Sequence, residues 1–111
     1  MIRVYICVYN IEQAFAEKEL EFEWNESKAS SNLEKHGVSF FTAAATFRNE
    51  RIERIDDRAD FGEVRWIALG RVWLEVYRVV FTWRGENLIR IISAQKASKD
   101  EQEIYYREIY P

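Results

Sequence analysis

The spacing of apolar residues changes along the chain and separates a helical part from a strand-rich part. Asn25 precedes residues 26–36, and Gly37 follows them. Because Asn is a preferred N-cap and Gly a preferred residue just past a helix end, residues 26–36 are predicted to form a helix. Ser39 is positioned to cap a second helix over residues 40–47, whose apolar residues recur at helical spacing.

After these helices the pattern becomes that of β-strands. Four segments rich in Val, Ile, Trp, Tyr and Phe are separated by a polar loop and by short glycine-containing turns, which is typical of an antiparallel meander. The strands are predicted over residues 51–55, 64–69, 73–83 and 88–94, with the loop at 56–63 and the turns at 70–71 and 84–87. Shorter strands over residues 3–9 and 22–24, and a short helix over residues 11–20, are expected before the first long helix.

A capping pattern marks the last element. Ser98, with Glu101 three positions later, forms a capping box and predicts a helix over residues 99–110. A chain of 111 residues is long enough for one compact core but not for two domains. The sequence therefore predicts an α+β single domain in which an antiparallel β-sheet is flanked by two N-terminal helices and one C-terminal helix.

Composition narrows the chemistry. One Cys and one His cannot build a zinc site, an iron–sulfur cluster or an internal disulfide, so we expect a cytoplasmic protein without metal or cofactor. The longest apolar run is far shorter than the roughly 20 residues that span a membrane, so no membrane association is expected. Because 16 basic residues face 19 acidic ones, a net charge of −3, any anionic ligand must be held by a local patch.

Two arginines lie on apolar faces of predicted strands. Successive residues of a strand point to opposite sides, so Arg65 shares its side with Ile67, and Arg90 shares its side with Ile92. A guanidinium group among aliphatic side chains is costly unless it is paired or reaches a groove. These two arginines are therefore candidates for binding an anion.

Charge is also divided along the C-terminal part. Residues 84–99 carry four cations against one carboxylate, a net charge of +3, and residues 100–111 carry a net charge of −3. Such separation is expected of a phosphate-binding patch on an acidic protein. Lysines beside a helix start are often only solvated, which is the interpretation we favour for Lys99.

The only histidine, His36, lies beside Lys35 at the end of the first long helix. The helix dipole there favours the protonated imidazole, so His36 is either a general acid or base or a capping residue that binds the last carbonyls. Lys28, Asn32 and Lys35 form a polar stripe on the same helix. The three tyrosines of the last helix exceed one buried stripe, so at least one hydroxyl group should face solvent.

Three segments, residues 22–28, 32–40 and 90–97, together with Glu101 and Tyr105, resemble the BrnT toxin family. They include the Lys-His-Gly-Val-x-Phe and Arg-Ile-Ile-Ser-Ala blocks in order and at compatible spacing. The resemblance covers about residues 22–110 and implies a RelE-like fold. We therefore expect a BrnT-like toxin domain over residues 21–111 and an N-terminal extension over residues 1–20. Asn25 stands where the family commonly has Asp, and Gln95-Lys96 where it often has Arg-Arg.

The resemblance implies an RNA-binding endoribonuclease toxin of a type II toxin–antitoxin system, which inhibits translation. The implied partner is a BrnA-like ribbon-helix-helix antitoxin, in a homodimer or a toxin–antitoxin heterotetramer. Without a metal site, cleavage would use the 2′-hydroxyl group of the RNA as nucleophile. The candidate catalytic residues are Lys35, His36, Arg65 and Arg90. The candidate substrate-binding residues are Lys28, Lys96, Glu101 and Tyr106. The alternative is a non-catalytic or degenerate toxin fold that only docks its antitoxin.

Overall fold

The computed structural model describes residues 7–9 and 20–111. Along the chain its elements are β1 (Cys7–Tyr9), β2 (Glu21–Glu23), α2 (Glu26–His36), α3 (Phe40–Ala45), the 3-10 helix η1 (Thr46–Arg48), β3 (Arg51–Ile55), β4 (Trp66–Val72), β5 (Glu75–Trp83), β6 (Leu88–Lys96) and α4 (Lys99–Ile109). The predicted α+β class is confirmed. The predicted helix over residues 11–20, apart from the non-helical Leu20, and the start of the predicted strand over residues 3–9 lie outside the described residues.

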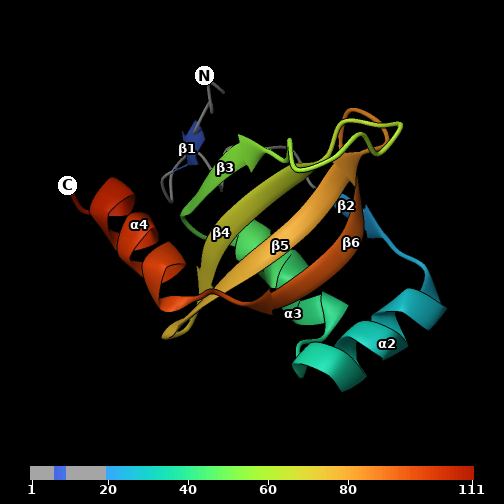
Figure 1. The fold of residues 1–111 in the computed structure, drawn as a ribbon, viewed down its shortest axis with the longest axis horizontal. Helices are drawn as coiled ribbons and strands as arrows, with labels where there is room; N and C mark the ends of the chain where they lie inside the picture. The colour runs from blue at the N-terminus through green and yellow to red at the C-terminus, as the bar shows by residue number, and fades with distance from the viewer. Residues whose placement is uncertain (1–6, 10–19) are drawn as a thin grey trace.

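The strands form one six-stranded sheet in the order β1-β3-β4-β5-β6-β2 (Figure 1). Strands β3 to β6 form the predicted antiparallel meander, and β1 adds to β3 in the antiparallel sense. The short β2 strand pairs with β6 in parallel, so the sheet is mixed rather than purely antiparallel. The pairing of β2 with β6 could not be predicted from periodicity, because more than sixty residues separate the two strands in the chain.

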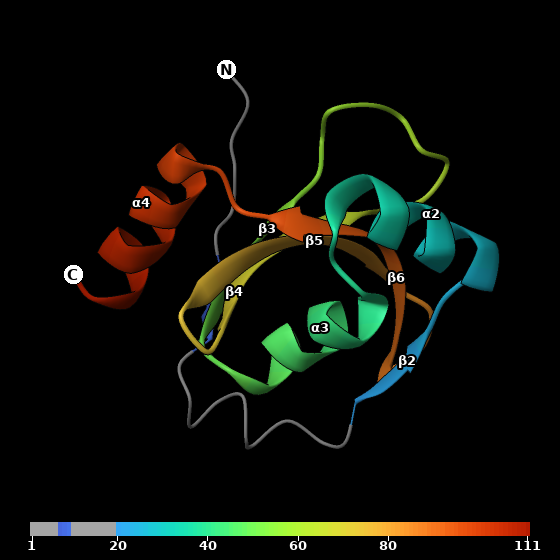
Figure 2. The ribbon, with the colours of Figure 1, turned by 90° about the horizontal axis from the view of Figure 1, so that it is seen from below.

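Helices lie on both sides of this sheet. Figure 2 shows α3 against one face, with α4 toward the other and α2 beside β6. The α3 face carries the larger apolar cluster, which includes Phe40, Phe47 and Phe81. A smaller cluster under α4 includes Leu69 and Tyr105. Apolar side chains therefore anchor α3 and α4 to the sheet.

The helix ends follow the capping residues. Asn25 Oδ1 accepts a hydrogen bond from the backbone N–H of Lys28 at 3.0 Å, and Gly37 adopts the left-handed conformation with φ of 70°. The backbone N–H of Gly37 donates to the carbonyl of Leu33. The Ser98–Glu101 capping box opens α4 as expected. These local signals fixed the bounds of α2 and the start of α4 correctly.

The β4–β5 turn was predicted in the wrong place. The sequence placed it at residues 70–71, but β4 continues to Val72 and the turn is formed by Trp73 and Leu74. Gly70 lies inside β4. Glycine is required at this position because an added Cβ atom would lie 2.9 Å from the Cβ of Thr46. This glycine permits β4 to pack closely against η1 and does not mark a turn. Trp73 instead turns the chain with φ of 58° and is 90% exposed.

Other bounds differ by one to three residues from the predicted ones. The α-helix expected over residues 40–47 ends at Ala45 and continues as η1. Strand β4 begins two residues later than predicted, and β6 runs two residues further, to Lys96. No helix within the described ranges is long and apolar enough to cross a membrane.

On α2 a polar residue is buried where the sequence predicted an exposed polar stripe. Asn32 is buried, whereas the adjacent Leu33 is half exposed. The Asn32 side chain donates to the carbonyls of Val38 and Ala94 and accepts from the backbone N–H of Ala94, at 2.8–3.1 Å. Strand β2 pairs only with Leu88–Arg90. Beyond β2, Asn32 therefore forms the hydrogen bonds that a neighbouring strand would form with the edge of β6. These bonds also attach α2 to β6.

Candidate functional site

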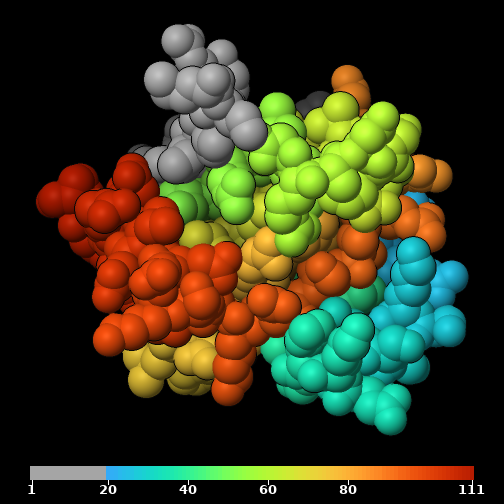
Figure 3. All heavy atoms as spheres, viewed as in Figure 1, coloured from blue at the N-terminus to red at the C-terminus, as the bar shows by residue number. Residues whose placement is uncertain are grey.

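The face of the sheet that carries α4 also carries a set of arginines. Strand register places Arg54 opposite Ile67, Arg78 opposite Leu69 and Arg90 opposite Thr82. Since Leu69 packs under α4, these side chains project from that same face. We define the arginine face by these residues together with Arg65, which precedes β4, and Arg58 in the β3–β4 loop. Figure 3 shows β5 and β6 in the space between this loop, α4 and α2.

Arg65 and Arg90 lie on either side of Thr82. The Thr82 hydroxyl group donates to the carbonyl of Val64 at 2.7 Å, which ties the segment before β4 to β5, and Thr82 pairs with Arg90 across β5 and β6. The Arg65 guanidinium lies 4.3 Å from the centre of the Phe61 ring, a cation–π contact that orients it. The side chains of Arg65 and Arg90 are 24% and 36% exposed, so both remain accessible to a ligand.

Two carboxylates connect these arginines through Arg84, in the β5–β6 turn. Glu63 lies 3.1 Å from Arg65 and 3.8 Å from Arg84. Glu23, on β2, lies 3.7 Å from Arg84 and 3.6 Å from Arg90. The result is a chain of alternating charges across the end of the sheet. At these exposures and distances the ion pairs are weak, so an anion of higher charge can compete for the guanidinium groups.

A second group of arginines lies nearer to α4. Arg58 donates two hydrogen bonds of 2.6 Å to Asp56, which hold the pKa of that carboxyl group below its usual range. Arg78 lies 3.1 Å from Glu101 of α4. Burial, followed by the charge of Arg58, lowers the pKa of Arg78, and Arg54 adds to this effect. Arg54 itself makes no ion pair with any described residue.

The arginine face has an excess of positive charge on an acidic protein. Arg58, Arg65, Arg78, Arg84 and Arg90 form ion pairs with four carboxylates, Glu23, Asp56, Glu63 and Glu101, and Arg54 forms none, so this set has six positive charges against four negative ones; Asp57 and Asp60 of the β3–β4 loop lie outside these ion pairs. Local cationic surfaces of this kind attract phosphate groups although the whole chain is negative. The expected sign separation thus arises mainly from strand faces and only partly from residues 84–99.

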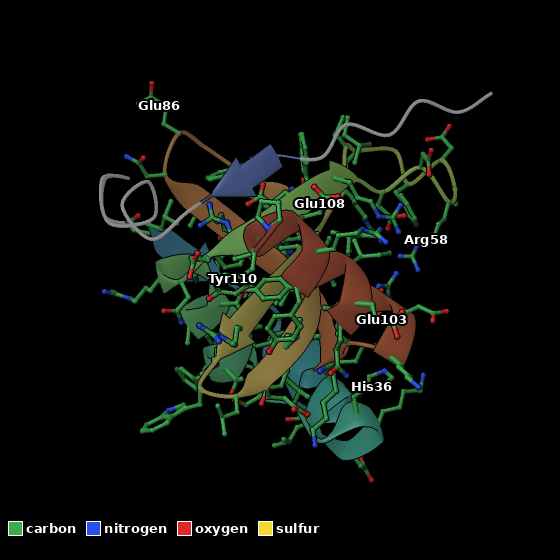
Figure 4. All side chains as sticks on the ribbon, turned by 90° about the vertical axis from the view of Figure 1, so that its left-hand side faces the viewer. His36, Arg58, Glu86, Glu103, Glu108 and Tyr110 are labelled. Carbon is green, nitrogen blue, oxygen red and sulfur yellow. The ribbon has the colours of Figure 1, made fainter. Side chains whose placement is uncertain are left out.

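The structure does not bring the end of α2 to Arg65 and Arg90. Helix α2 meets β6 at Ala94 through Asn32, four residues along the strand from Arg90, which corresponds to about 13 Å. Figure 4 shows His36 at the opposite end of the molecule from Glu86, which lies in the β5–β6 turn. Lys28, Lys35 and His36 are exposed on α2. No described group binds the His36 side chain, and the backbone of Gly37 closes the helix instead.

Three further candidates occupy different places. Lys96 is opposite Tyr77 in the strand register, on the α3 face, and pairs with Glu75 at 3.4 Å. Tyr106 packs against Tyr105 and Tyr110 on the part of α4 remote from the β5–β6 turn. Only Glu101 lies at the arginine face, where it faces Arg78. Lys96 is thus separated from Arg90 by the sheet itself, because the register shift opposite Val80 and Phe81 moves the alternation of β6 by one residue between them.

Several residues of this site were missed by the sequence reasoning. Arg54 and Arg78 each lie on the same strand side as aliphatic residues, the signal that identified Arg65 and Arg90, and applying it to every strand would have found them. Glu23 and Glu63 gave no comparable signal. Their role depends on strand pairing and loop packing that local pattern does not encode. Within the described ranges, no three His, Cys, Asp or Glu side chains form a cluster suited to a metal ion.

Comparison with known proteins identifies the family. Residues 24–101 match the model of the family described as "Ribonuclease toxin, BrnT, of type II toxin-antitoxin system". The crystal structure of the Brucella abortus ribonuclease toxin BrnT superposes with a TM-score of 0.51 at 24% sequence identity, covering 72% of this chain and 99% of that one. No functionally curated protein sequence matches significantly. The family match spans well over half of the chain, which therefore belongs to the BrnT family of ribonuclease toxins of type II toxin–antitoxin systems.

Proposed function

We propose that the arginine face is the RNA-cleaving surface of this BrnT family member, and that cleavage proceeds without a metal ion. The observation that carries the proposal is the placement of two accessible guanidinium groups, Arg65 and Arg90, on either side of Thr82, linked through Arg84 by shared carboxylates. Two guanidinium groups on the same side of the sheet can bind the non-bridging oxygens of phosphate groups in an RNA strand.

The proposed reaction is an intramolecular transesterification. The 2′-oxygen attacks the adjacent phosphorus atom, the bond to the 5′-oxygen breaks, and the products carry a 2′,3′-cyclic phosphate and a 5′-hydroxyl group. Negative charge accumulates on the phosphorane oxygens during the attack, and pre-positioned guanidinium groups stabilise that charge. By analogy with other charge-stabilising donors, each of Arg65 and Arg90 should contribute roughly 10²–10³ in rate.

The 2′-hydroxyl proton needs an acceptor, and the leaving oxygen needs a donor. Glu63 and Glu23 lie beside the two arginines and are candidates to accept the proton. Either carboxylic acid could then return the proton to the 5′-oxygen, so that protons balance over the reaction. Lys28, Lys35 and His36 on α2 are assigned to contacts with a longer RNA strand and not to the chemical step.

Cleavage of a synthetic RNA tests this proposal. Arg65→Met and Arg90→Met should each lower the cleavage rate about 10²–10³-fold, while Arg48→Met, an exposed arginine of η1, should leave the rate unchanged. Cleavage by the unaltered protein should persist with a chelator and yield 2′,3′-cyclic phosphate ends. Full activity of both Arg65→Met and Arg90→Met in folded protein would refute the assignment. Absence of any cleavage, with intact antitoxin binding, would favour the non-catalytic docking module.

The proposed consequence of RNA cleavage in the cell is inhibition of translation. The proposed partner is a BrnA-like ribbon-helix-helix antitoxin that covers the arginine face with carboxylate side chains, because that face has excess positive charge. Co-expression of this chain with the product of the neighbouring reading frame should yield a complex that no longer cleaves RNA. A complex that retains full cleavage activity would show that the antitoxin binds elsewhere.

A further inference from the structure

A small cavity lies beside the arginine face, between α4 and the sheet. It has a volume of about 110 Å³, and most of its wall is aliphatic. Ile67 and Leu69 form the sheet side, and Ile104 forms the helix side. A slot with apolar walls on two opposite sides accommodates a flat ring better than a branched ligand, because both faces of the ring lose contact with water.

Three charged residues line the same cavity, Glu53 and Arg54 of β3 and Glu101 of α4, and the carboxylate of Glu53 is buried and bonded to Arg51. Arg54 reaches it from β3, and Glu101 reaches it from α4. Arg54 is the arginine of this face that no described carboxylate neutralises, so its guanidinium donors are available. Glu101 is held in place, because one carboxylate oxygen accepts the backbone N–H of Ser98 at 2.8 Å and the other faces Arg78. Each oxygen keeps a further lone pair.

The cavity is continuous with the proposed phosphate site. Ile67 lines the cavity, and Arg65, just before the start of β4, precedes it by two residues, a separation of about 7 Å along extended backbone. This separation is comparable with the span from the phosphate of a nucleotide to its base. A chain whose phosphate lies at Arg65 can therefore place an adjacent unpaired base over the cavity.

We propose that this cavity binds the base of an unpaired guanosine in RNA, with the Arg54 guanidinium donating to O6 and N7 of the ring. The proposal rests on the RNA-cleaving function proposed above and adds a base preference to it. Guanine presents two acceptors to Arg54, and its N1–H and amino group are complementary to the remaining lone pairs of Glu101. Adenine presents an amino group where guanine has O6, so it would place donor against donor at Arg54.

Binding of uncleavable RNA tests the proposal separately from catalysis. Fluorescence anisotropy should be measured with labelled 2′-O-methyl oligouridylates that carry one central guanine, adenine or 7-deazaguanine. The guanine oligonucleotide should bind about 5- to 100-fold more tightly than the adenine one, and 7-deazaguanine should lose most of this preference because it lacks N7. Arg54→Met should abolish the preference, and Arg48→Met should retain it.

Equal affinity for guanine and adenine, or a preference that persists in Arg54→Met, would overturn the base-binding proposal. The comparison of guanine with 7-deazaguanine uses the unaltered protein, so it decides the matter even where a variant folds poorly. Guanosine 5′-monophosphate should compete only weakly, and competition as strong as that of the oligonucleotide would assign the cavity to a free nucleotide. RNA cleavage that depends on Arg65 but shows no base preference would leave the proposed function intact. Absence of binding to every oligonucleotide would contradict both proposals.

Discussion

The two faces of the sheet use their side chains in different ways. On the α3 face the core is sealed by rings, since Phe81 is fully buried and packs edge-on against Phe47 at 4.9 Å. The charged groups there form a buried set around Arg51, which bonds Glu53 and the carbonyl of Phe47. On the opposite face α4 covers only part of the sheet, and partly exposed arginines occupy the rest.

This difference separates stability from binding. Burial of apolar rings provides most of the free energy of folding, whereas partly exposed ion pairs contribute at most about 1 kcal/mol each. The stability of the sheet does not require more arginines than carboxylates on one of its faces. The arginine face contributes little to stability and is available for the RNA binding proposed above, so mutations on the α3 face should lower stability and mutations on the arginine face should lower activity.

The largest effect on stability is expected from the α3 face. Phe81→Ala removes a fully buried ring that contacts Phe47 and Trp83, and should lower the free energy of unfolding by about 3–5 kcal/mol in urea titrations. Arg65→Met, on the opposite face, should change it by less than about 1 kcal/mol. Comparable losses in both variants would mean that the arginine face is a structural element like the other.

A slightly smaller effect is expected where α2 joins the sheet. Asn32→Leu leaves the backbone N–H of Ala94 and two carbonyl groups without their partner, at a cost of at least about 2 kcal/mol. Hydrogen exchange of the Ala94 amide should accelerate in the same variant. Ser31→Leu changes an exposed neighbour and serves as the control. An unchanged Ala94 exchange rate in Asn32→Leu would show that the edge of β6 is protected in another way.

A further comparison concerns two glycines. Gly70→Ala would place a Cβ atom 2.9 Å from the Cβ of Thr46 and should destabilise the fold by about 1–3 kcal/mol. Gly85→Ala meets only an ordinary contact, 3.7 Å from Leu88, and should be close to neutral. Thermal unfolding of the two variants checks this difference. Equal melting temperatures would mean that β4 does not pack tightly against η1.

The smallest effect concerns the pH dependence of the arginine face. Because Arg58 lowers the pKa of Asp56 below its ordinary value of 3.8, the pair stabilises the fold fully above that pH. The contribution is lost as the pH falls through the lowered pKa. Asp56→Asn should cost less than about 1 kcal/mol at pH 7, since Arg58 is half exposed. The difference from the unaltered protein should vanish in acid, and a difference that grows in acid would contradict this pairing.

Sequence reasoning predicted the elements better than their assembly. Asn25, Gly37 and Ser98 act on backbone groups within four residues, so the helix ends could be predicted from local pattern. Gly70 was misread as a turn because its requirement comes from Thr46, which is distant in the chain. Likewise, the parallel pairing of β2 depends on where α2 and α3 return the chain.

The candidate site shows the same limit. Alternation along single strands was enough to single out Arg65 and Arg90, because a charge on an apolar strand face is visible in the sequence. The position of His36 relative to them depends on how Asn32 fixes α2 to β6, a contact between residues 62 positions apart. Periodicity contains no information about such contacts.

The most direct test of the central claim, that the arginine face binds RNA, is an NMR titration of the labelled protein with a 2′-O-methyl oligoribonucleotide. Amide shifts should change in β5, β6 and the β3–β4 loop, around Arg65, Thr82 and Arg90, whereas those of Phe41 and Arg48 on the α3 side should not respond. The account would be contradicted by changes concentrated on α3 and η1, or by the same changes around Thr82 in an Arg65→Met/Arg90→Met variant.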